Sequence, residues 1–287
     1  MALPHPLVSK LIAKTKDLPS LPGPVLEAVR LAADPNTNTA QIAKAISSDV
    51  SLAARVLRLS NSAYYGLPRQ VTSIQESVML LGKATVRNVA LVAATQSWFD
   101  KLPLDRKGEP ILLWQHAVGV AAASQAIADF VDKKLIEDAF CAGLLHNVGK
   151  ALFVLWFKDK MPKIMEEAVA TKTAIYKMER KKLGYDHQEA GFALAESWNL
   201  PESILMVIRY HHEPNECNPT TQLVDMVHVA DYVTKSLGIG VGAEEMVIEV
   251  EPEALDRLGI NTPEKMDMLS ARVLEKYEAA QSLLAED

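Results

Sequence analysis

Apolar residues recur at helical spacing along most of the chain, and this periodicity limits what it can fold into. Leu52, Val56 and Leu59 follow one another at steps of four and three, which places them on one face of a helix. Alternating segments bounded by hairpin turns, which indicate strands, are almost absent. The closest one, residues 245–252, is too short to found a sheet. We therefore predict an all-α fold.

Capping residues indicate where these helices begin and end. Ser48 and Asp49 offer side-chain acceptors just before one apolar stripe, and Gly66 ends the pattern after it. Residues 71–99 predict either two helices or one helix that is broken near Gly82.

The clearest interruption of the helical pattern lies at residues 101–110, which contain two prolines, a glycine and five charged residues. Charge also changes there: residues 1–100 carry a net +4, and the remainder carries −10. We predict an N-terminal helical lobe over residues 1–105 and a second helical lobe, with a helical tail, over residues 106–287.

Composition excludes several classes of protein. Hydrophobic residues make up 49% and charged residues 23%, as in soluble globular proteins. No run approaches ~18 uninterrupted apolar residues, so no membrane span is expected. The two cysteines, Cys141 and Cys217, form no CxxC pair and favour the reducing cytoplasm. The net charge of −6 gives no general reason to expect nucleic acid as a partner.

Histidines are concentrated in the second half of the chain, where six of the seven lie between residues 116 and 228 in apolar helical contexts. His228 and Asp231 stand three residues apart, so they share a helix face. Imidazole and carboxylate groups are ligands for Zn, Fe, Mn or Ni, and helices can bring them together. A lone histidine is more often a core or surface residue, as expected for His5, so the prediction rests on the whole set.

The order of these residues resembles the HD superfamily of metal-dependent phosphohydrolases. That signature has a histidine, a His-Asp pair, further histidines and a final aspartate, which match His116, His146-Asn147, His187, His211-His212 and Asp231. The surroundings "HQEAG", "YHHEP" and "VHVAD" are also similar to segments of this superfamily.

The N-terminal half narrows the resemblance. The stretches "LPSLPGPVLEAVRLAADPN", "ISSDVSLAARVLRLSNSAYYG" and "TSIQESVMLLGKATVRNVAL" are similar to the opening helices of HDOD domains, the HD-related output domains of bacterial signalling proteins. The resemblance covers roughly residues 18–238. It implies an N-terminal helical lobe packed on a degenerate HD-like helical bundle, and a regulatory role with a signalling protein as partner.

The resemblance also implies a set of metal ligands: His116, His146, Asn147, His187, His211, His212 and Asp231. The departure from the superfamily pattern is Asn147, because active members have an aspartate there and an amide brings no charge. We expect one cation (Fe, Mn, Zn or Ni) on His116, His146 and Asp231, with Asn147 as a weak fourth ligand; whether a metal is bound stays open. Lys150 is either a phosphate contact or a residue that compensates a helix dipole.

Three functions remain to be weighed. The main hypothesis is a cytoplasmic bacterial regulatory protein with little or no catalysis. The alternative is a metal-dependent phosphohydrolase or phosphodiesterase acting on a nucleotide or cyclic dinucleotide, and Asn147 argues against it. A hemerythrin-like sensor lacks support because no Glu-x-x-His pair occurs.

Overall fold

All regular elements among the residues that the structure describes are helical, which confirms the all-α prediction. The computed structural model describes residues 6–14, 21–99, 109–242 and 249–283. Half of the strand candidate at 245–252, residues 245–248, falls outside the described residues, and residues 249–252 form no strand. The first α-helices are α1 (Pro6–Lys14), α2 (Gly23–Ala33), α3 (Thr39–Ser47), α4 (Val50–Ser60), α5 (Ile74–Leu81), α6 (Lys83–Phe99), α7 (Glu109–Val131) and α8 (Ile136–Leu145). The others are α9 (Val148–Trp156), α10 (Met161–Thr171), α11 (Ile175–Leu183), α12 (His187–Ser197), α13 (Glu202–Tyr210), α14 (Gln222–Ser236), α15 (Pro252–Leu258) and α16 (Pro263–Ala280). Short 3-10 helices are η1 (Ala63–Tyr65), η2 (Lys133–Leu135), η3 (Pro214–Glu216) and η5 (Gln281–Leu283).

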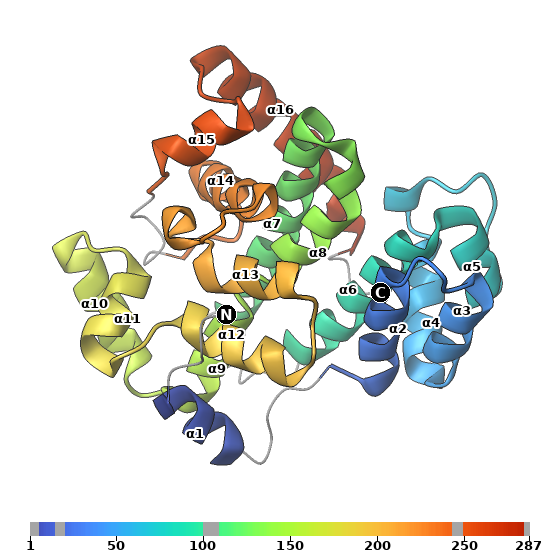
Figure 1. Cartoon of the computed structure of the whole chain (residues 1–287), viewed down its shortest axis with the longest axis horizontal. Helices are drawn as coiled ribbons and strands as arrows, with labels where there is room; N and C mark the ends of the chain where they lie inside the picture. Colours follow the sequence, from blue (N-terminus) through green and yellow to red (C-terminus); the bar gives the residue numbers. More distant parts are fainter. Residues whose placement is uncertain (1–5, 15–20, 100–108, 243–248, 284–287) are drawn as a thin grey trace.

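Helices α2 to α6 pack together on one side of the molecule (Figure 1). The side chain of Asp49 accepts a hydrogen bond from the Leu52 N–H group and so caps α4. Gly82 has φ 89°, a conformation that favours glycine, and it separates α5 from α6. The segment predicted as one or two helices is therefore two.

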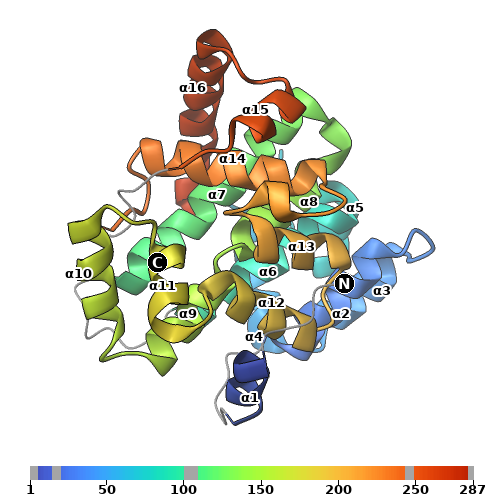
Figure 2. The same ribbon diagram turned by 60° about the vertical axis from the view of Figure 1, so that its left-hand side comes forward.

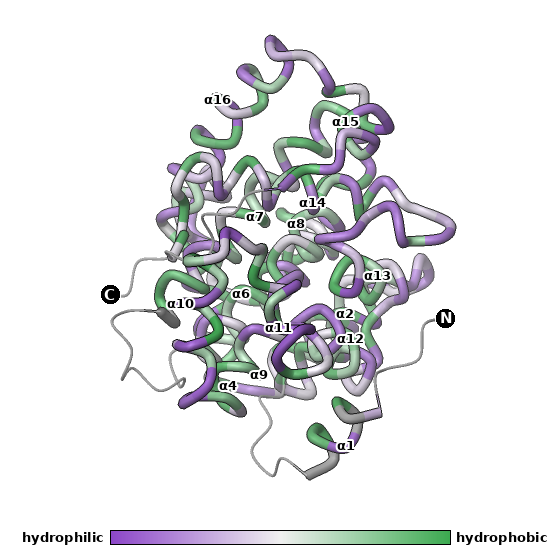
Figure 3. The backbone as a smooth tube through the Cα atoms, turned by 90° about the vertical axis from the view of Figure 1, so that its left-hand side faces the viewer, coloured by the Kyte–Doolittle hydropathy of each residue, from purple (hydrophilic) through white to green (hydrophobic). Residues whose placement is uncertain are grey.

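Helix α7 forms the centre of the second half. It packs against α8, α14 and α16, and the small side chains of its many buried alanines let these helices approach closely. Gly143 of α8 shows how close: a Cβ there would lie 2.8 Å from the Val120 carbonyl oxygen of α7. Green, hydrophobic segments gather in the middle of the molecule, where α6, α7 and α8 run (Figure 3).

Polar contacts join the first helices to the rest. Arg87 of α6 donates to the Asp138 carboxylate at 2.9 Å, and the Asn88 amide donates to the Glu137 carbonyl at 2.9 Å. Residues 100–108, which hold most of the predicted break, lie outside the described part, so the division at residue 105 stays a prediction. Helix α1 lies against α12, at the lower edge of Figures 1 and 2.

Two glycines set the crossing of α9 and α12. A Cβ at Gly149 would lie 1.9 Å from the His187 carbonyl oxygen, and one at Gly191 would lie 3.0 Å from the Gly149 nitrogen. Only hydrogen side chains allow this approach. The crossing fixes where the start of α9, just after His146, stands relative to His187 at the start of α12.

Two stretches are long and apolar enough to span a membrane by length and composition: Ile111–Val131 and Lys133–Trp156. However, 78% and 83% of their most apolar windows are buried inside the protein. They contain α7, α8 and α9, so their apolar character is accounted for by the core.

Candidate metal centre

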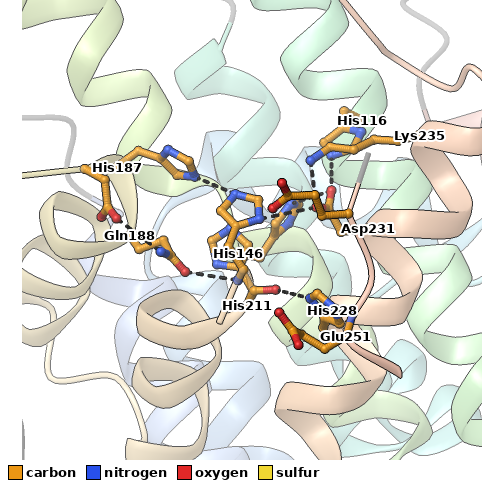
Figure 4. Close-up of polar contacts among 12 residues, drawn as sticks. His116, His146, His187, Gln188, His211, His228, Asp231, Lys235 and Glu251 are labelled. Atoms are coloured by element: carbon orange, nitrogen blue, oxygen red, sulfur yellow. Dashed lines mark hydrogen bonds and ion pairs between the residues drawn. The ribbon is translucent and has the colours of Figure 1, made fainter. Parts of the chain in front are cut away.

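Two groups of side chains in the second half converge with metal-site spacing. The first contains His116, His146 and Asp231, and within it the ligand atoms lie within 4.8 Å of one another. The second, with the same spacing, contains His187, His211 and His212. The groups adjoin, because the rings of His146 and His211 have centroids 5.0 Å apart (Figure 4).

Helix ends bring most of these residues together. His146 ends α8 at the break before α9, and His211 ends α13. His187 is the first residue of α12, which begins with a capping box formed by Asp186 and Glu189. Only His116 and Asp231 lie inside helices. The other four of these six residues lie where a helix begins or ends, so their positions depend on the helix boundaries and not on the spacing along one helix face.

In the first group, the hydrogen bonds of the rings leave Nε2 as an acceptor. His116 Nδ1 lies 3.3 Å from the Ile239 carbonyl oxygen, and His146 Nδ1 lies 2.6 Å from that of Gly143. A carbonyl oxygen only accepts, so Nδ1 carries the proton in each neutral ring. His116 Nε2 then faces Asp231 Oδ1 at 2.9 Å as one acceptor facing another. A cation between them satisfies both, as two ligands of one ion.

The second group is held in a similar way. His211 Nδ1 lies 3.1 Å from the Ile208 carbonyl oxygen, and His187 Nδ1 lies 2.6 Å from Glu179 Oε2. Such a carboxylate commonly orients a metal-ligating histidine. Within the described residues, Nε2 of both His146 and His211 is buried without a hydrogen-bond partner. Buried acceptors of this kind are what a cation satisfies, so the residues present fit a metal.

Burial keeps the histidines neutral, as metal ligands must be. It lowers the pKa of His146 from 6.5 to about 4, and it lowers those of His187, His211 and His212 well below their ordinary value. Burial also raises the pKa of Glu179, while the hydrogen bond from the His187 N–H group acts to lower it.

Asp231 behaves differently from the histidines. Its burial acts to raise the pKa, but the Lys235 ammonium beside it holds that pKa well below 3.8. Asp231 is the only carboxylate in the two groups.

Comparison with known proteins places this arrangement in a family. The sequence model of the HDOD domain matches residues 18–214. The chain belongs to the HDOD family. A solved HDOD domain protein of unknown function from Geobacter sulfurreducens is 26% identical with a TM-score of 0.73, covering 96% of this chain and 92% of that one. A Shewanella amazonensis structure, named as a candidate phosphohydrolase, is 25% identical with a TM-score of 0.71, covering 95% and 97%.

One curated relative, an uncharacterised protein of Treponema pallidum, is 29% identical over 223 residues. The match covers 76% of this chain but only 43% of the relative, so this chain corresponds to less than half of that protein. The HDOD match itself ends at residue 214, before α14 and Asp231, although the resemblance was expected to extend to residue 238.

Asn147 is the predicted ligand that the structure does not join to the two groups. Its side chain is 7% exposed, and its amide oxygen and nitrogen have no hydrogen-bond partner in the described part of the chain. It lines a cavity of about 10 Å³, together with Thr95 and Phe99. That space suits about one water molecule. Its role as a weak fourth ligand stays a prediction.

Lys150 and His228 are also placed by the structure. Lys150 is buried in the first turn of α9, where a positive charge opposes the helix dipole, so the dipole-compensating interpretation is wrong. Its contact with a phosphate stays a prediction. His228 uses both ring nitrogens: Nδ1 donates to the His211 carbonyl at 2.7 Å, and Nε2 accepts from the Glu251 N–H group at 2.9 Å. It therefore supports His211 and is no ligand.

Four residues around this HDOD site were not foreseen. Glu179 and Tyr176 lie on α11, which was not predicted, and the Tyr176 ring stacks on His212 with centroids 4.7 Å apart. The Gln188 side chain accepts from the His212 N–H group at 3.0 Å. Lys235 follows Asp231 by four residues, a spacing that predicts a contact on any helix.

Proposed function

We propose that this HDOD protein is a cytoplasmic bacterial regulatory protein that acts through contacts with a signalling protein and hydrolyses little or nothing. The observation that carries the proposal is the charge of the candidate centre. Two divalent cations and the Lys235 ammonium, which lies 2.7 Å from Asp231 Oδ2, would together bring five positive charges against the single carboxylate of Asp231. In a buried site of low dielectric, that excess is unfavourable.

A single cation fits better. Fe, Mn, Zn or Ni would be held by His116, His146 and Asp231, whose atoms form the group that contains the carboxylate. When bound, such an ion polarises an oxygen ligand or lowers the pKa of bound water. The chain's own contribution is to hold the imidazoles neutral and correctly oriented.

The burial of the site also supports a non-catalytic role. The residues His146, His187 and His211 are each 0% exposed. The Tyr176 ring covers His212, with an angle of 15° between the two planes. A phosphoester would have to displace the Tyr176 ring before it reached the stacked face of His212.

The second candidate function is a metal-dependent phosphohydrolase acting on a nucleotide or cyclic dinucleotide. It is supported by the complete set of neutral histidines, by the buried Lys150, and by the name of the Shewanella relative. In this case Lys150 would meet the phosphate of the substrate.

A hydrolysis screen separates the two functions. Purified protein is assayed with Mn²⁺ or Mg²⁺ on phosphomonoesters, nucleotides and cyclic dinucleotides, with metal content measured on the same preparation. We expect turnover at the level of a His146→Ala variant. Brisk metal-dependent turnover that His146→Ala abolishes would establish the enzyme instead.

A further inference from the structure

The only carboxylate of the centre already has a cation beside it. The Lys235 ammonium donates to Asp231 Oδ2 at 2.7 Å, one turn further along α14. Both side chains are buried, with 7% and 6% of their surfaces exposed. Figure 4 shows Lys235 approaching Asp231 beside His116. A buried lysine beside a carboxylate that binds metal is electrostatically unfavourable for metal binding, because the ammonium charge repels the metal ion.

The two oxygens of Asp231 face different groups. Oδ1 lies 2.9 Å from His116 Nε2 and 3.8 Å from His146 Nε2, so it belongs to the first group. Oδ2 lies 3.7 Å from His212 Nδ1 and is the oxygen nearer the second group. A carboxylate that bridges two cations uses one oxygen for each. Here Lys235 holds the oxygen that a second cation would need.

We propose that the Lys235 ammonium takes the place of a second divalent cation, so that the centre binds one metal ion at His116, His146 and Asp231. The group of His187, His211 and His212 then stays without an ion, because it has no carboxylate of its own and Oδ2 is engaged. This rests on the single-cation site of the proposed function. It adds the residue that limits the site to one ion.

A purely structural ion pair predicts something else. If Lys235 only neutralises Asp231, its removal leaves a buried carboxylate without a partner, and the protein loses stability whatever metal is present. If Lys235 replaces a cation, a divalent ion can enter in its place and restore the stability. The number of bound ions and the effect of metal on stability therefore distinguish the two roles.

The experiment compares the full chain with Lys235→Met, Lys235→Gln and Lys235→Arg. Gln keeps a donor for Oδ2 without the charge, and Arg keeps the charge. The matched control is Lys133→Met, because Lys133 pairs with Asp129 at the same four-residue spacing but is 77% exposed. Each protein is expressed with Mn²⁺, dialysed against a fixed Mn²⁺ concentration and analysed for Mn per chain. Thermal unfolding is measured with Mn²⁺ and with EDTA.

We expect roughly one Mn per chain in the wild type, Lys235→Arg and Lys133→Met, and roughly two in Lys235→Met and Lys235→Gln, a twofold rise. The uncharged variants should also gain more in Tm from Mn²⁺ than the wild type does, and Mn–Mn coupling should appear in their EPR spectra. A variant that folds only when Mn²⁺ is supplied supports the proposal in the same way.

Equal Mn counts in the wild type and the uncharged variants would overturn the proposal, as would two ions in the wild type or variants that unfold with and without Mn²⁺. A wild type without metal, with one ion in the uncharged variants, would keep Lys235 as the cation substitute and refute the single-cation site. Hydrolysis is scored separately, so an active wild type refutes the regulatory proposal without changing the Mn counts.

Discussion

The crossing of α9 and α12 gives a sharp test of how the candidate centre is held together. In Gly149→Ala, the new Cβ would lie 1.9 Å from the His187 carbonyl oxygen and 2.7 Å from the Gly191 nitrogen. Contacts to real Cβ atoms begin near 3.0 Å, so the two helices have to separate by about 1 Å. Both obstructing atoms belong to the backbone and cannot rotate away.

The expected destabilisation follows from this clash. Overpacking a core costs ~1–3 kcal/mol, and a backbone clash belongs at the upper end, at about 3 kcal/mol. The better helix propensity of alanine offsets ~1 kcal/mol of that. For a chain of 287 residues, the remaining ~2 kcal/mol corresponds to a fall in Tm of roughly 4 °C. Because His146 directly precedes the start of α9, the same separation displaces this ligand, so affinity for Mn²⁺ should also fall.

A graded series of alanine variants provides the controls. In Gly191→Ala the nearest atom is the flexible Ile208 Cγ2 at 2.9 Å, so a smaller loss is expected. In Gly23→Ala nothing lies within 4 Å, and because this glycine is the first residue of α2 and precedes Pro24, a change near zero is expected. Urea unfolding monitored by circular dichroism ranks the three. If Gly149→Ala proves as stable as Gly23→Ala, the close crossing is refuted.

Two further predictions concern the centre. Asn147→Asp should unfold more easily in EDTA, because a buried carboxylate would replace an amide that has no partner among the described residues. The variant should also bind more Mn²⁺ than the wild type. An unchanged Mn content would place residue 147 outside the coordination sphere. In EDTA the wild type should lose stability as the pH falls from 6.5 toward 4, because the unfolded chain takes up protons first. The pKa of His146, lowered from 6.5 to about 4, alone accounts for about 3 kcal/mol at the end of that range. Urea unfolding at several pH values checks this, and a profile as flat as that of His146→Gln would contradict it.

The sequence alone predicted the helices whose ends carry clear capping signals. Asp49 and Gly82 are examples, and both act in the structure as their residue types suggest. Helix α11 was missed, because its sequence IYKMERKKL is mostly polar and shows no long apolar stripe. Because α11 was missed, two of its residues were missed as well: Glu179, which orients His187, and Tyr176, which covers His212.

In the candidate centre, too, some contacts could be predicted from the sequence and others could not. Periodicity could not show that His116 and Asp231 meet, because 115 residues separate them; the order of motifs in a known family predicted it. The contact of Lys235 with Asp231 was different, since their spacing on a helix was readable from the sequence. Lys150 was misread because the stretch around His146 was taken as a helix end, whereas a new helix begins at Val148 and places the lysine in its first turn.

Helix α14 lies beyond the residues that the HDOD sequence model matches, yet it is part of the same fold. The match ends at residue 214, yet α14 packs along α7 and supplies Asp231 and Lys235. A fragment cut at residue 214 would contain every histidine of the two groups but no carboxylate. It would also expose to water the surface of α7 around Gly119, where a Cβ would lie 2.9 Å from the Thr234 side chain of α14. Such a fragment is therefore expected to aggregate, and the boundary that sequence similarity draws for this domain is shorter than the unit that can exist alone.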